Sequence, residues 1–86
     1  MVGFAMPTVL TVRNIRVVIY TNDHPPPHVH AVHGNECHAR FALNCPDGPP
    51  DLLDSTGFKA TDINELGDAI DTDLTRLCRI WRDIHD

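Results

Sequence analysis

Three histidines, His24, His28 and His30, lie within seven consecutive positions, and Asp23 precedes the first of them. Imidazole and carboxylate groups bind divalent metal ions, and imidazole also exchanges protons near neutral pH. Three consecutive prolines, Pro25 to Pro27, hold φ at about −65° and lack an N–H, so they predict a stiff polyproline II lead-in. Three kinds of site fit this segment: a metal site, a proton-transfer site or a brace of hydrogen bonds to loop carbonyls.

The residues after the prolines predict a strand over 28–32. Side chains alternate between the two faces of a strand, so His28 and His30 are expected on the same face. This pair can bind one divalent ion, and Asp23 or His24 completes the set if the proline run folds back. The candidate metal ligands are therefore Asp23, His24, His28 and His30. Without a metal, His28 and His30 are the candidate catalytic acid and base.

Two hairpins are expected to position these groups. Runs rich in β-formers over 9–12 and 16–21 predict the first hairpin, and 28–32 with 36–43 predict the second. In the strand over 36–43, successive side chains alternate between the two faces of the sheet. Cys37, Ala39, Phe41 and Leu43 are expected on one face, and His38, Arg40 and Ala42 on the other. Leu52 and Leu53 suggest a further short edge strand.

In the C-terminal third of the chain, the spacing of the apolar residues changes to the period of a helix. Its apolar residues recur every three or four positions, which is typical of an amphipathic helix. They are Ile63, Leu66, Ile70, Leu74, Leu77, Trp81 and Ile84. Asp71 to Asp73 offer an N-cap within the run, so one long helix and two short helices both remain open. The predicted fold class is α+β: a four-stranded, mostly antiparallel sheet of two hairpins, packed by these C-terminal helices. One domain over 6–86 is expected, with residues 1–5 as a loosely ordered extension.

The composition limits the partners. The chain has 86 residues and a formal net charge of −5, which argues against wrapping nucleic acid by charge neutralisation. Nucleic acid contact is expected only indirectly or through a local patch of Arg13, Arg16 and Arg40. No run of about 18 apolar residues predicts a membrane span. Three cysteines without a C-x-x-C pair favour reduced thiols and a cytoplasmic location.

Partner binding is the remaining possibility. Polyproline segments dock into grooves of other proteins, so Pro26, Pro27 and Arg40 are candidate partner-binding residues. The alternative is that the prolines form a rigid wall against Tyr20 or Trp81. The expected partner is a small protein or a second copy of the chain.

Several segments together resemble one bacterial family, called domain of unknown function 4160. The most specific is the Asp-His-x-Pro-Pro-His-Val-His pattern, which here occupies 23–30 with Pro25 at the variable position. The resemblance covers residue 6 to about residue 84. Its other elements are Met6 to Leu10, Arg16 to Tyr20, Asn22, Gly34, Ala39, Phe41, Gly57, Phe58 and Trp81. His33, His38 and His85 lie outside the family pattern, and Lys59 replaces its usual capping serine.

The resemblance implies a small α+β domain. Members often sit beside a gene for another small protein, which resembles the arrangement of toxin–antitoxin pairs. The expected function is therefore a small cytoplasmic component of such a two-gene module, acting through a cognate protein partner. The alternative is a metal-dependent hydrolase or nuclease that uses His24, His28 and His30.

Overall fold

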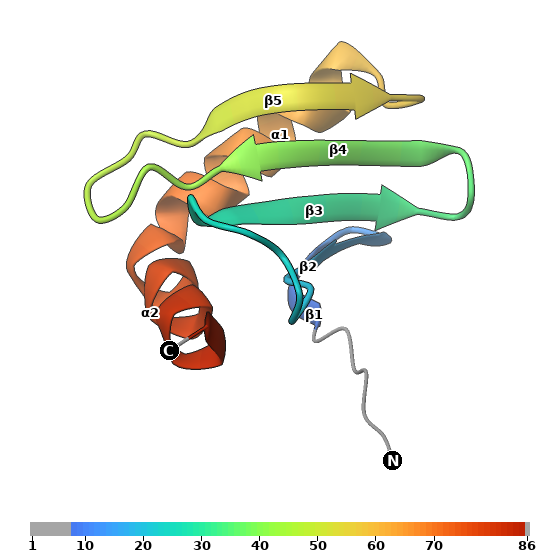
Figure 1. The fold of residues 1–86 in the computed structure, drawn as a ribbon. Helices are drawn as coiled ribbons and strands as arrows, with labels where there is room; N and C mark the ends of the chain where they lie inside the picture. Colours follow the sequence, from blue (N-terminus) through green and yellow to red (C-terminus); the bar gives the residue numbers. More distant parts are fainter. Residues whose placement is uncertain (1–7, 86) are drawn as a thin grey trace.

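The computed structural model describes residues 8–85, so the expected extension over 1–5 lies outside the described residues. Five antiparallel strands form one sheet in the order β1-β2-β3-β4-β5, and two helices follow (Figure 1). The strands are β1 Thr8–Val12, β2 Ile15–Val18, β3 His28–His33, β4 Cys37–Ala42 and β5 Asp51–Thr56. The helices are α1 Ala60–Thr72 and α2 Leu74–His85. The expected α+β class is confirmed.

The expectation of four strands is wrong, because β5 extends the sheet beyond β4. Leu52 and Leu53 belong to this edge strand, which pairs with β4 over residues 51–56. All six of its side chains are exposed, so no alternation of apolar and polar residues marks it in the sequence. Main-chain pairing and surface polar contacts position β5, and neither leaves an alternating apolar pattern in the sequence.

The C-terminal run forms two helices, which resolves the alternative between one helix and two. The break falls at Asp73, within the segment that offered an N-cap. The Asp73 carboxylate accepts hydrogen bonds from Arg76. The Asp73 carbonyl accepts the first main-chain hydrogen bond of α2, which the Leu77 amide donates. Arg76 also donates to the Val9 carbonyl, which ties α2 to β1. Neither helix within 8–85 has the length and apolarity needed to cross a membrane.

Both helices cover one face of the sheet (Figure 1). Apolar side chains from alternate strand positions meet the helical stripe and form the core. The fully or almost fully buried members include Val17, Val29, Ala31, Ala39, Phe41, Leu66, Ile70, Leu77 and Trp81. Trp81, a member of the predicted apolar stripe, is buried, since only 5% of the residue is exposed. The alternation predicted for β4 is also confirmed at Ala39 and Phe41.

The opposite face of the sheet carries the polar cluster. One row of paired residues crosses this face from β2 to β5. In strand order it consists of Val18, His30, Arg40 and Asp54. The segment between β2 and β3 passes over this face (Figure 1). Val18 is fully buried although it lies outside the helix-facing core, which is consistent with cover from this segment.

The cysteines differ from the expectation of reduced thiols. Cys45 and Cys78 form a disulfide that joins the loop before β5 to α2. Within the described residues, Cys37 is the free cysteine. The two partners are 33 positions apart in the sequence, and only the packing of α2 beside this loop brings them together.

Candidate functional site

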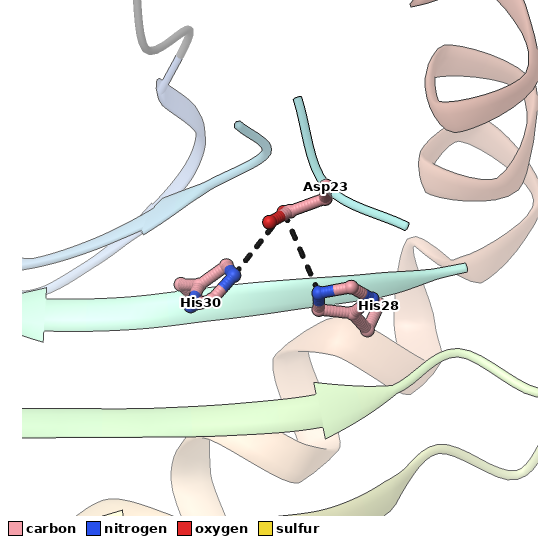
Figure 2. Close-up of side chains that lie close together, drawn as sticks. All are labelled: Asp23, His28 and His30. Atoms are coloured by element: carbon pink, nitrogen blue, oxygen red, sulfur yellow. Dashed lines mark hydrogen bonds and ion pairs between the residues drawn. The ribbon is translucent and has the colours of Figure 1, made fainter. Parts of the chain in front are cut away.

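His28, His30 and Asp23 converge on the face of the sheet that carries the polar row of His30, Arg40 and Asp54. The predicted placement of His28 and His30 on one face of β3 is confirmed, and Asp23 reaches them from the preceding loop (Figure 2). The Asp23 Oδ2 atom lies 3.1 Å from His30 Nε2 and 3.5 Å from His28 Nε2. One ligand atom from each residue lies within 4.8 Å of the other two. The side chains are largely removed from water, with exposed fractions of 15%, 12% and 11% for Asp23, His28 and His30.

A turn brings Asp23 back over the strand. Thr21 and Asn22 form this turn, in which the Asp23 amide donates to the Tyr20 carbonyl over 3.2 Å. The Tyr20 amide in return donates to Asp23 Oδ2 over 3.3 Å. The proline run then bends at Pro25 and Pro26 and does not continue as a straight polyproline II segment. The chain therefore folds back, as a ligand role for Asp23 requires.

His28 is held in a defined orientation. Its Nδ1 atom lies 2.9 Å from the Pro26 carbonyl, which only accepts hydrogen bonds, so Nδ1 is the donor. In the neutral ring, Nε2 then carries a lone pair, and this lone pair faces the Asp23 carboxylate (Figure 2). On its other side, the His28 ring packs against Trp81, with ring centroids 5.2 Å apart. In that neutral form, two electron-pair donors face each other across a gap that suits a cation.

His30 lies at the centre of a wider cluster. Its Nδ1 atom is 3.1 Å from Nε2 of His38, and its ring meets the edge of Tyr20 with centroids 4.5 Å apart. Burial lowers the pKa of His30 below its usual 6.5, and positive charge on His28 or His38 lowers it further, against the opposing effect of Asp23. A neutral imidazole is the form that binds metal ions.

The site opens into a cleft of about 360 Å³. His24 lines this cleft but lies outside the three-residue cluster, so the structure does not bring it together with the other candidate ligands. Pro26 and Arg40, which were candidate partner-binding residues, line the same cleft. Pro27, the third of these candidates, lines a second cleft together with Trp81.

Two contributors to the site were not assigned a role from the sequence. His38 pairs with Val32 in the β3–β4 ladder, which makes it the diagonal neighbour of His30. Diagonal neighbours lie within reach of long side chains, so the hairpin register contained this signal. Asp54 accepts hydrogen bonds from Arg40 and comes from β5, the strand that the four-stranded prediction omitted.

Comparison with known proteins identifies the family. The sequence profile of the family described as "Domain of unknown function (DUF4160)" matches residues 14–82. No protein of curated function matches the chain, and no solved structure does. The matched range covers most of the chain and contains Asp23, His28 and His30. The chain therefore belongs to the DUF4160 family.

Proposed function

We propose that the protein binds one divalent first-row metal ion through Asp23, His28 and His30 and uses it for hydrolysis. The observation that carries this proposal is the spacing of the ligand atoms. Two ligands bound tetrahedrally at about 2.1 Å from an ion lie about 3.4 Å apart. The measured distances from Asp23 Oδ2 to the two Nε2 atoms, 3.1 and 3.5 Å, are close to this separation.

The chemistry of the ligand set supports a catalytic site over a structural one. Two imidazoles and one carboxylate leave coordination positions open, as in catalytic zinc sites and non-haem iron sites. The cleft beside the three ligands gives solvent and small molecules access to those positions. A divalent ion held by these three side chains would lower the pKa of a bound water to about 7, which is the chemistry that hydrolysis at neutral pH needs.

A brace of hydrogen bonds explains less of the geometry of this cluster than a metal site does. A brace accounts for the bonds of His30 and for the bond from His28 Nδ1 to Pro26. It leaves the Nε2 lone pair of a neutral His28 facing a carboxylate 3.5 Å away. An ion between these atoms removes that repulsion.

Metal titration by calorimetry tests the proposal. Protein freed of metal with a chelator is expected to bind one equivalent of Zn²⁺ or Mn²⁺. A metal ligand at His30 Nε2 would require the tautomer with its proton on Nδ1, and that N–H would donate to His38. Loss of a residue that hydrogen-bonds to a metal ligand weakens metal binding by about 10–100-fold, so His38→Ala is expected to weaken metal binding by this factor.

His33→Ala is the matched control for His38→Ala. His33 is an exposed histidine at the end of β3 and lies outside the cluster of ligands. Metal affinity is expected to stay unchanged in this variant. Equal affinities in the two variants would contradict the role given to His38, and absence of binding to the wild type would contradict the proposed function.

A second candidate is action through a protein partner, as expected for one half of a two-gene module of toxin–antitoxin type. The exposed edge strand β5 supports it, because an unpaired edge accepts a further strand. The exposed large hydrophobic residues of the described chain, Leu52 and Leu53, both lie on this strand. Co-expression with the product of a neighbouring small gene is expected to give a stable complex that Leu52→Asp disrupts. A complex unaffected by this change would exclude β5 as the interface.

A further inference from the structure

Arg40 contributes a positively charged side chain to the cleft. It lies directly opposite His30 in the β3–β4 ladder and lines the same cleft as the three proposed ligands. Directly opposite residues on one face of a sheet have Cβ atoms about 5 Å apart, so Arg40 lies beside His30, one of the proposed ligands. Of the described residues that line this cleft, Arg40 is the only lysine or arginine. Its side chain is 41% exposed and therefore accessible to a ligand from solvent.

The guanidinium group is oriented but has donors to spare. Nε and Nη2 of Arg40 donate to Asp54 Oδ2 over 2.9 and 2.6 Å. A guanidinium has five N–H groups, so three remain after these two bonds. Asp54 holds the group in place from β5, because the two residues pair directly in the β4–β5 ladder.

The charge of the cleft changes sign when a metal ion binds. With neutral imidazoles, Asp23, Asp54 and Arg40 leave one net negative charge around the cleft. A divalent ion converts this to one net positive charge. The metal-free cleft therefore disfavours anions, whereas the metal-loaded cleft attracts them through both the ion and Arg40.

We propose that the metal-loaded cleft binds the oxyanion group of a small ligand, a phosphate or carboxylate, between the ion and Arg40. This inference rests on the proposed function, since the ion supplies one side of the binding site. Planar guanidinium groups match both kinds of oxyanion. A volume of about 360 Å³ suits a small molecule. The acidic chain, with a net charge of −5, disfavours a long polyanion as the natural ligand.

Anion titration of metal-free and Zn²⁺-loaded protein tests the proposal, with inorganic phosphate and acetate as separate probes. At least one probe is expected to bind the loaded protein and not the metal-free protein. That probe should also strengthen Zn²⁺ binding by the same factor by which Zn²⁺ strengthens anion binding, because coupling is reciprocal. The stronger of the two probes identifies phosphate or carboxylate as the group recognised.

Two variants with opposite expected effects locate the anion. Arg40→Gln removes a charged donor and is expected to weaken anion binding to the loaded protein by about 10-fold or more. Asp54→Asn removes a competing negative charge and is expected to strengthen anion binding. Arg16→Gln is the matched control, because Arg16 lies on β2 outside the cleft. It makes the same charge change as Arg40→Gln and is expected to leave anion affinity nearly unchanged.

The outcomes separate this inference from the proposed function. Zn²⁺ binding with no affinity for either anion would overturn the inference and leave the metal site intact. Equal anion affinity in Arg40→Gln and Arg16→Gln would also overturn it, as would equal anion affinity with and without Zn²⁺. Failure to bind Zn²⁺ at all would overturn the proposed function itself.

Discussion

Replacement of Trp81 by alanine is expected to lower the free energy of unfolding by about 3–5 kcal/mol. Trp81 is 5% exposed and belongs to the core between α2 and the sheet. Its ring also contacts the rings of His28 and His85, with centroid separations of 5.2 and 3.7 Å. Small domains have a total stability near the low end of about 5–15 kcal/mol, so this loss unfolds much of the population. Urea denaturation measures the loss.

Leu52→Ala is the control for the Trp81 variant. Leu52 is 44% exposed on β5, and changes at such surface positions alter stability by about 0.5 kcal/mol or less. A Trp81→Ala protein that unfolds at nearly the same urea concentration as Leu52→Ala would contradict the core role of Trp81.

Loss of a single metal ligand is expected to weaken metal binding by more than about 100-fold. This exceeds the effect of losing His38, which only hydrogen-bonds to a ligand. Asp23→Asn is the most conservative variant, because its amide oxygen still accepts the Tyr20 amide hydrogen bond while the charge is removed. Metal at 100 times its dissociation constant stabilises the folded wild type by about 2.7 kcal/mol. This corresponds to a rise of about 10 °C or more in Tm for a domain of this size.

His24→Ala provides the control for Asp23→Asn. His24 lines the cleft but lies outside the ligand cluster, so the metal-induced rise in Tm is expected to persist in this variant. A rise of equal size in Asp23→Asn would contradict the ligand role of Asp23. Loss of the rise in His24→Ala would return His24 to the ligand set.

The side-chain patterns of the sequence were sufficient to predict most of the fold. The alternation in β4 and the apolar stripe from Ile63 to Ile84 both record burial against the same core, so they predicted which faces meet. The length of β5 was underestimated because its residues are exposed, and main-chain pairing with surface polar contacts holds it in place of buried apolar side chains. The Cys45–Cys78 disulfide depends on the approach of a loop to α2, which no local pattern encodes.

The site was predictable to the extent that it is local in sequence. Strand parity was enough to place His28 and His30 on one face. The return of Asp23 depends on the turn at Thr21 and Asn22, whose direction strand parity does not determine. The contact of His38 with His30 required the register of β3 and β4. The pairing of Arg40 with Asp54 required the full length and register of β5, of which the sequence suggested only a short edge strand at Leu52 and Leu53.

Anomalous X-ray scattering from crystals grown with Zn²⁺ or Mn²⁺ tests the central claim most directly. The ion is expected in the cleft, about 2.0–2.2 Å from Nε2 of His28, Nε2 of His30 and a carboxylate oxygen of Asp23. The same experiment should show His30 Nδ1 still within hydrogen-bond distance of His38. Anomalous density elsewhere on the chain, or none at all in crystals that contain excess metal, would contradict the proposed metal centre.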